Sequence, residues 1–246
     1  MNMSKIKQFH LTRVLLARPQ GSQNIGACCR AMKNMGFSQL SIIKKCGIDL
    51  SEVRTFALSA FDIYEKAQFF DTMESALADS ALVLGTTRRI GKRRKAFSLF
   101  PEEAAQRVLQ GNLWPLTIVF GNEETGLSQE ELDYCHYAVQ IPTSDDFPSI
   151  NLSHALQIVL YAFSRVYTQN CLTPVKATAL EDLQPAIESI LDNLQSLGFF
   201  KIGGKRDMKV FLTDICARAG LSIRETRRFS ALFQKIEGLC KSRYKD

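Results

Sequence analysis

The 246-residue sequence lacks long apolar runs, metal-binding spacings and a disulfide pattern. No run approaches the roughly 18 apolar residues of a membrane span, and residues 1–10 lack a signal-peptide core, so we expect no membrane partner. The three histidines and seven cysteines include no C-x-x-C pair, and we expect no catalytic metal. The odd number of cysteines favours reduced thiols in a cytoplasmic protein.

Two phosphate-binding fingerprints are also missing. Neither G-x-G-x-x-G nor the P-loop pattern occurs, which disfavours an ordinary NAD-type dehydrogenase. Positive charge, by contrast, is abundant, because the net charge is +6 and six of the eight residues at positions 88–95 are lysine or arginine. Such like charges repel one another unless phosphates supply the counter-charge. The block therefore indicates a polyanionic partner, with a solvated loop as the alternative.

Apolar runs alternate with helical patterns over the first 163 residues. This alternation predicts an α/β fold with a parallel sheet. Strands are predicted at residues 10–16, 39–43, 81–85, 116–120 and 138–141. The carboxyl ends of such strands commonly hold ligands. The candidate ends here are rich in glycine, threonine or serine: residues 85–87, 121–126 and 141–153.

The third of these ends leads through Pro148 into an apolar helix. Small polar residues at the first turn of a buried helix suit a ligand site, because the first N–H groups of a helix have no partner within it. Ser51 is the predicted cap of a helix at residues 51–60, and Gly36 is the predicted end of a helix that begins at residue 24. Capping boxes are predicted at Ser128 and Ser222.

The pattern changes after residue 163. Residues 167–178 have no clear period and are interpreted as a linker. Three segments with helical spacing follow, with exposed cations on their polar faces. The chain is therefore predicted to have a first domain at residues 1–168 and a small helical accessory domain at residues 175–246.

Three segments, each placed after a predicted strand, resemble the SPOUT-class RNA 2′-O-methyltransferases, and within them the TrmJ-type tRNA methyltransferases. Each segment alone is a weak signal, but their order makes the combination specific. They are Asn24-Ile25-Gly26-x-x-x-Arg30 with the following Ala-Met-Lys-Asn-Met-Gly, Phe120-Gly121-Asn122-Glu123-Glu124-x-Gly126-Leu127, and Ile141-Pro142 followed by Ser149-Ile150-Asn151-Leu152-Ser153.

The resemblance implies a parallel sheet with a deep trefoil knot at its C-terminal edge, followed by a small helical extension. It also implies transfer of a methyl group from S-adenosylmethionine to the ribose 2′-hydroxyl of nucleotide 32 in the anticodon loop of tRNA. Members are homodimers with active sites at the subunit interface. The sequence departs from the wider class after Pro142, where residues 143–147 stand in place of a glycine-containing loop.

The resemblance also assigns residues to roles. The catalytic candidates are Arg30, Asn24, Ser149, Asn151 and Glu123. The cofactor-binding candidates are Thr86, Thr87, Arg88, Gly121, Ile141, Ser149, Ile150, Asn151 and Leu152, with Gly121 and Gly126 allowing close approach of the backbone. The RNA-binding candidates, most of them in the basic block, are Arg18, Arg89, Arg93, Arg94, Lys95, Arg227 and Arg228.

Several roles have alternatives at this stage. Arg30 would act either as a general base or by orienting the 2′-oxygen and stabilising charge, and the second is favoured because a guanidinium resists deprotonation. Asn24 would fix the loop of Arg30 or the backbone of a partner subunit, or it would cap its own helix. Glu123 would pair with Arg30, fix a turn or favour a helix dipole. Ribosomal RNA as the substrate, and a catalytically inactive SPOUT-fold RNA-binding protein, are the rival functions.

Overall fold

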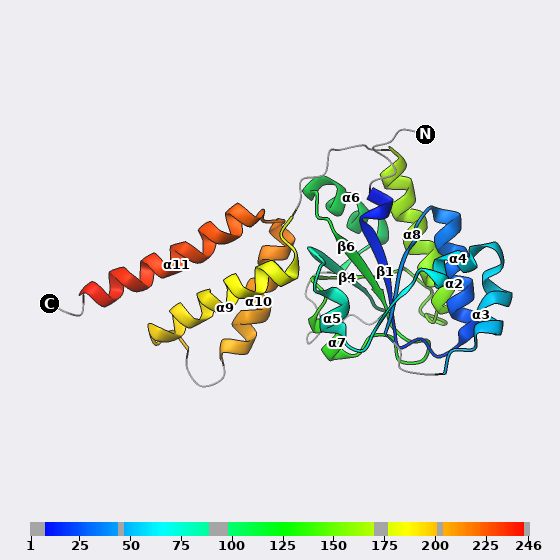
Figure 1. Ribbon diagram of the computed structural model, residues 1–246, viewed down its shortest axis with the longest axis horizontal. Coiled ribbons are helices and arrows are strands. Elements are labelled where there is room, and N and C mark those ends of the chain that lie inside the picture. The colour runs from blue at the N-terminus through cyan, green and yellow to red at the C-terminus, as the bar shows by residue number, and fades with distance from the viewer. Residues whose placement is uncertain (1–7, 44–46, 89–97, 170–176, 201–203, 244–246) are drawn as a thin grey trace.

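The computed structural model describes residues 8–43, 47–88, 98–169, 177–200 and 204–243. In this part of the chain, a sheet of seven parallel strands is flanked by helices, and three further helices follow (Figure 1). The strand order is β3-β2-β1-β6-β4-β7-β5. The strands are β1 (Thr12–Ala17), β2 (Gln39–Ile43), β3 (Gln68–Phe70), β4 (Leu82–Thr86), β5 (Ser98–Leu99), β6 (Leu116–Phe120) and β7 (Tyr137–Val139).

The helices lie on both faces of this sheet and beyond it. They are α2 (Ser22–Met35), α3 (Leu50–Ala57), α4 (Phe61–Glu65), α5 (Met73–Leu77), α6 (Pro101–Gly111), α7 (Gln129–Asp133), α8 (Leu152–Gln169), α9 (Leu180–Ser196), α10 (Gly204–Ala219) and α11 (Ile223–Arg243). The predicted parallel α/β fold is confirmed. No helix among the described residues is both long and apolar enough to cross a membrane.

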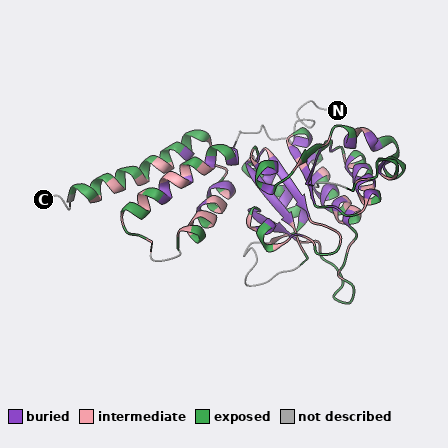
Figure 2. Ribbon diagram, turned by 60° about the horizontal axis from the view of Figure 1, so that its bottom comes forward, coloured by how far each residue is buried: buried purple, intermediate pink, exposed green. Residues whose placement is uncertain are grey.

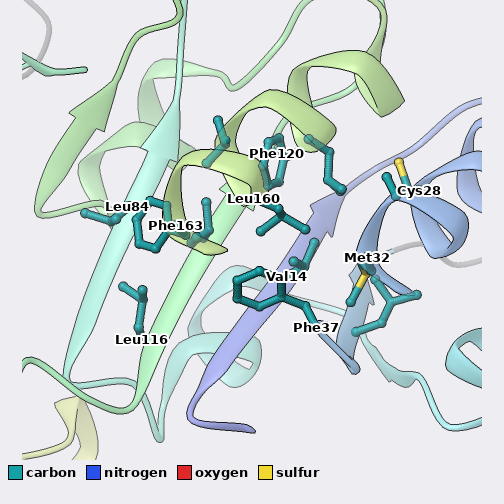
Figure 3. Close-up of a cluster of buried hydrophobic side chains, with 14 of the residues drawn as sticks. Val14, Cys28, Met32, Phe37, Leu84, Leu116, Phe120, Leu160 and Phe163 are labelled. Carbon is teal, nitrogen blue, oxygen red and sulfur yellow. The ribbon is translucent and has the colours of Figure 1, made fainter. Parts of the chain in front are cut away.

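Successive residues of the central strands point to opposite faces of the sheet, which divides the core in two. On one face Val14 and Leu116 pack with α2, α6 and α8, where Met32, Leu160 and Phe163 are fully buried (Figure 3). On the other face a second cluster joins the strands to α5, α7, α9 and α10. Buried residues accordingly concentrate along the strands in Figure 2. Both faces of the sheet are covered, as expected for parallel strands.

The helix ends follow the expected chemistry except at Ser51. Gly36 ends α2 in the left-handed conformation (φ 84°), and the capping box at Ser128 is formed, as is the reciprocal pairing of Ser222 with Glu225. The predicted cap at Ser51 is wrong, because the Asp49 carboxylate accepts hydrogen bonds from the backbone N–H groups of Ser51 and Glu52. A carboxylate is the stronger acceptor for the first helical N–H groups.

The predicted linker also begins too early. Helix α8 continues to Gln169, and Tyr167 is fully buried in the first core cluster. Its hydroxyl forms a hydrogen bond with Thr12 Oγ1 at 3.0 Å. Burial raises the pKa of Tyr167 well above its ordinary value. The aromatic side chain of Tyr167 thus extends the core one helical turn beyond residue 163, where the predicted apolar pattern ended.

Helices α9 and α10 contact residues at the amino ends of the strands. The N–H groups of Leu180 and Glu181 donate to the carbonyl oxygens of Ser80 and Ala78, each at 2.8 Å. The Arg218 guanidinium lies 5.6 Å from the ring centroid of Tyr137, at the start of β7. These contacts lie at the amino ends of the strands, and Figure 1 shows α11 extending away from the sheet.

Gly26, within the first motif, is required by helix packing. A Cβ atom there would lie 2.5 Å from the carbonyl oxygen of Val53 and 2.9 Å from the backbone nitrogen of Ala57. Real Cβ atoms do not approach backbone atoms this closely, so α2 and α3 can pack together only with glycine at this position.

Gly26→Ala should therefore lower the free energy of unfolding by about 1–3 kcal/mol, the usual cost of overpacking. Urea unfolding at equilibrium measures this change. Gly238→Ala is the matched control, because Gly238 lies in α11 with nothing within 4 Å of an added Cβ atom. There alanine should stabilise by about 0.5–1 kcal/mol. Equal effects at both sites would contradict the packing argument.

Candidate functional site at the carboxyl ends of the strands

A pocket opens where β4, β6 and β7 end. Eight of the nine predicted cofactor-binding residues line it, namely Thr86, Thr87, Arg88, Gly121, Ile141, Ser149, Ile150 and Leu152. The ninth, Asn151, is not part of the lining. Their role in cofactor binding stays a prediction, but sequence reasoning placed residues from four separate segments around one cavity. Asn122, Thr125, Thr143 and Pro148 also line it and were missed. These four residues lie within or next to the motif segments in the sequence, and this position could have identified them.

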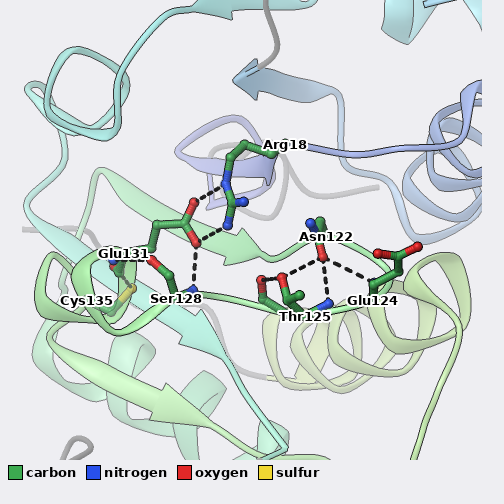
Figure 4. Close-up of polar contacts among 8 residues, drawn as sticks. Arg18, Asn122, Glu124, Thr125, Ser128, Glu131 and Cys135 are labelled. Atoms are coloured by element: carbon green, nitrogen blue, oxygen red, sulfur yellow. Dashed lines mark hydrogen bonds and ion pairs between the residues drawn. The ribbon is translucent and has the colours of Figure 1, made fainter. Parts of the chain in front are cut away.

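The side chain of Asn122 stabilises the turn after β6. Its Oδ1 accepts hydrogen bonds from the backbone N–H groups of Glu124 (3.1 Å) and Thr125 (2.7 Å) and from the Thr125 hydroxyl (2.9 Å; Figure 4). Gly126 closes the turn with φ 67°. A Cβ atom on Gly121 would lie 2.1 Å from the Gly126 carbonyl carbon. Gly121 is therefore required by its close approach to this turn. Its predicted role in leaving room for a cofactor stays a prediction.

Glu123, in the same turn, accepts three hydrogen bonds from the segment that follows β1. The donors are the backbone N–H groups of Gln20 (2.9 Å) and Gly21 (3.2 Å) and the Asn24 side-chain amide (2.9 Å). Burial alone would raise the pKa of the Glu123 carboxyl, but these hydrogen bonds outweigh burial and the pKa is lowered. Of the interpretations of Glu123, fixing a turn agrees with the geometry. The described contacts include no pairing of Glu123 with Arg30.

Asn24 and Asn151 connect the first and third motifs. The side-chain amide of Asn151 donates to Asn24 Oδ1 at 3.0 Å. Asn151 Oδ1 in turn accepts from the backbone N–H (2.9 Å) and hydroxyl (2.7 Å) of Ser153, and so caps α8. The cap interpretation of Asn24 is wrong, because α2 begins at Ser22 and Gly21 is its N-cap. This contact lies within a single chain. The location of the active site at a subunit interface stays a prediction.

Residues 11–161 match the SpoU rRNA Methylase family. This chain belongs to that family. A TrmJ tRNA (cytidine-2′-O-)-methyltransferase of Methanocaldococcus jannaschii is 38% identical over 63% of this chain and 67% of its own length. A TrmJ tRNA (cytidine/uridine-2′-O-)-methyltransferase of Klebsiella pneumoniae is 33% identical over 72% and 68%. The chain is therefore a methyltransferase, and the resemblance found in the sequence is confirmed.

Solved structures agree with this family assignment. TrmJ from Z. mobilis ZM4 superposes with a TM-score of 0.74 at 26% identity, covering 92% of this chain and 99% of that one. The SpoU methyltransferase AviRb from Streptomyces viridochromogenes, solved in complex with AdoMet, has a TM-score of 0.51 at 20% identity over 65% and 62%, which shows a shared fold. Membership of the SpoU family implies the trefoil knot of the SPOUT fold.

Arg30, the catalytic candidate of this SpoU-family chain, is exposed on α2. It lies six residues beyond Asn24, which in a helix corresponds to about 9 Å along the axis and a different face. Asn24 therefore points toward Glu123 and Asn151, while Arg30 faces outward. No hydrogen bond or ion pair joins Arg30 to a carboxylate among the described residues.

Of the RNA-binding candidates, Arg18 is held most firmly. Its guanidinium forms two hydrogen bonds of 2.7 Å with the carboxylate of Glu131, which also completes the Ser128 capping box (Figure 4). The hydrogen bond to Glu131 raises the pKa of Arg18. Arg227 and Arg228 are exposed on α11. The remaining four candidates, Arg89, Arg93, Arg94 and Lys95, lie outside the described residues.

The lowered pKa of Glu123 predicts a pH-dependent contribution to stability. A carboxyl whose pKa is lower in the folded than in the unfolded state stabilises the fold above its unfolded pKa, and this stabilisation is lost as the pH falls through the folded pKa. Glu123→Gln should therefore lower the free energy of unfolding by about 1 kcal/mol at pH 7. The deficit should shrink below pH ~4. Urea titrations at both pH values measure this. Exposed Glu124→Gln is the control, and a deficit independent of pH would show that charge is not involved.

Proposed function

We propose that this protein transfers a methyl group from S-adenosylmethionine to the ribose 2′-hydroxyl of tRNA, at nucleotide 32 of the anticodon loop. The observation that carries the proposal is the hydrogen-bonded chain Glu123–Asn24–Asn151, which joins the three motif segments beside one pocket. The TrmJ names of the relatives support both the reaction and the tRNA substrate.

The pocket has the chemistry that an adenosyl group requires. Apolar side chains of Val139, Ile141 and Leu152 line one part of it, and Thr86 and Thr87 contribute hydroxyl groups. Thr86 Oγ1 donates to the carbonyl oxygen of Val119 at 3.0 Å, so its oxygen is left to accept. When bound, S-adenosylmethionine supplies an electrophilic methyl group on a positively charged sulfonium. The carboxylate of Glu123, also in the lining, favours a positive charge.

Arg30 is proposed to hold the 2′-hydroxyl and the neighbouring phosphate. A guanidinium stays protonated and offers planar, bidentate donors that match phosphate oxygens. Arg30 would therefore orient the 2′-oxygen toward the methyl group and stabilise the negative charge that develops on it. The proton would leave to a phosphate oxygen or water. Ser149, which lines the pocket, is placed to position the same nucleotide.

The helical accessory domain proposed for residues 175–246 is assigned to RNA binding. Its contacts with Ser80, Ala78 and Tyr137 lie at the amino ends of the strands, whereas the pocket lies at their carboxyl ends. A five-residue strand such as β4 spans about 15 Å, so one RNA must be extended to meet both sites. A folded RNA such as tRNA meets this requirement.

Homodimer formation is proposed from the exposed face of α8, the helix that packs against α2, which carries Arg30. Helices α2 and α8 pack side by side, and α8 exposes Ile158 (42%) and Tyr161 (52%) one turn apart. Large apolar side chains on one exposed face favour burial against a second copy. An active site shared between subunits would then place Arg30 against the partner's pocket. A cytoplasmic location is proposed from the tRNA substrate.

Incubation with S-adenosylmethionine carrying a labelled methyl group tests the reaction. Total tRNA and ribosomal RNA are offered separately, and ribose methylation is mapped by alkaline hydrolysis, which spares 2′-O-methylated positions. Label at nucleotide 32 of tRNA supports the proposal. Label only in ribosomal RNA would show that the proposed tRNA substrate is wrong. The family is named for methylation of ribosomal RNA, so this outcome is tested directly. Absence of label in both RNAs would favour the rival function, a catalytically inactive RNA-binding protein.

Arg30→Ala should lower the rate of methyl transfer at least 100-fold, since a positioned charge in a reaction site typically contributes this much. Binding of S-adenosylhomocysteine, measured by calorimetry, should remain within about threefold of wild type, because Arg30 is outside the pocket lining. Arg54→Ala is the control, being exposed on the adjacent helix α3. Unfolding of the Arg30 variant would show a structural role instead.

The double variant Arg227→Glu, Arg228→Glu should weaken RNA binding without changing the rate at saturating RNA, because these side chains are remote from the pocket. Each lost phosphate contact should reduce the slope of log affinity against log salt by about 1. Fluorescence anisotropy from 50 to 200 mM salt measures the slope. An unchanged slope would remove α11 from the RNA interface.

A further inference from the structure

An aromatic side chain is exposed to solvent beside the pocket. Phe147 is 77% exposed, the largest value for any large hydrophobic side chain among the described residues. The hydrophobic effect favours burying such a ring, so the fold gains no stability from leaving it in this position. Phe147 lies in the segment where the sequence departs from the wider SPOUT class.

The position of Phe147 is fixed from both sides. Thr143 and Pro148 line the pocket, so residues 144–147 form a short arch with both ends on the pocket wall. The arch is braced by a hydrogen bond of 3.3 Å from the backbone N–H of Asp146 to the Ser144 hydroxyl. A proline restricts the residue before it to extended backbone conformations. Phe147 is therefore presented at the rim in a limited range of directions.

The charge of this arch excludes one kind of RNA contact and favours another. Asp145 and Asp146 are both exposed, and neither forms an ion pair within the described part of the chain. Carboxylates with no ion-pair partner among the described residues repel phosphates. An exposed aromatic face, by contrast, attracts unpaired bases, because every base can stack on it. The arch therefore suits the base of a nucleotide rather than its backbone.

We propose that Phe147 stacks on an unpaired nucleobase of the RNA loop and so holds the target nucleotide with its ribose at the pocket. This inference rests on the proposed function, since it assigns a substrate contact to the same site. Stacking requires no particular hydrogen-bonding edge. A site that relies on Phe147 would therefore accept cytidine and uridine alike. The ribose and phosphate of the nucleotide are left to Arg30 of a second copy of the chain.

The test compares two anticodon-arm RNAs and three variants. One RNA is intact, and the other lacks only the base of the target nucleotide, so its ribose and phosphates are unchanged. The variants are Phe147→Ala, Phe147→Trp and the control Phe69→Ala. Phe69 is 50% exposed on β3, at the far side of the sheet from the pocket strands. Affinity is measured by fluorescence anisotropy with S-adenosylhomocysteine present, and methyl transfer is measured separately.

Phe147→Ala should weaken binding of the intact RNA by about tenfold or more, the usual loss when one stacked base loses its aromatic partner. The same variant should bind the abasic RNA as wild type does. Phe147→Trp should restore affinity for the intact RNA, and Phe69→Ala should change neither. An equal loss on both RNAs overturns the inference. So does weaker binding of S-adenosylhomocysteine, or dissociation of a dimer in sedimentation, because Phe147 would then support the pocket or a subunit contact.

These outcomes are separable from the fate of the proposed function. If the wild-type protein methylates neither tRNA nor ribosomal RNA, the proposed reaction fails. The binding comparison between intact and abasic RNA still decides whether Phe147 stacks on a base.

Discussion

The carboxylate of Glu123 is the group on which the site depends. It accepts hydrogen bonds from Gln20, Gly21 and Asn24, and through Asn24 it is connected to Asn151 at the start of α8. Hydrogen bonds to an ionised acceptor are stronger than those between neutral groups. One charged side chain therefore fixes the loop after β1, the first turn of α2 and the cap of α8. These elements carry Arg30 and one wall of the pocket, so their relative positions follow from this network.

A second constraint comes from the direction of the strands. All the strand pairs are parallel, so every strand ends at the same edge of the sheet. The pocket occupies that edge, and helices α9 and α10 contact the other. This arrangement separates the proposed chemistry from the proposed RNA anchoring. Arg18 lies at the same edge of the sheet as the pocket, because its guanidinium is hydrogen-bonded to the Glu131 carboxylate at the end of β1.

The sequence predicted the elements best where the local pattern was strong. β2 and β6 were predicted to the residue, since apolar residues make up most of both strands. β3 and β5 were missed because they contain three and two residues and carry no period of their own. Gly121 and Gly126 were predicted to let the backbone approach the cofactor, and this stays a prediction. Gly26 and Gly121 allow the backbone to approach its own neighbours, a requirement that depends on where α3 and the turn at Gly126 are placed.

The sequence by itself determined the α/β pattern, the family and the segments that form the site. These follow from hydrophobic periodicity, turn chemistry and motif order, all of which depend on residues close together in the chain. Only the tertiary structure decided which side chains meet. Asn151 and Asn24 are 127 positions apart, and Arg18 and Glu131 are 113 apart. Such contacts depend on strand order and on the packing of α2 against α8. Neither is encoded in local spacing, because a helix or strand has the same pattern whichever neighbour it packs against.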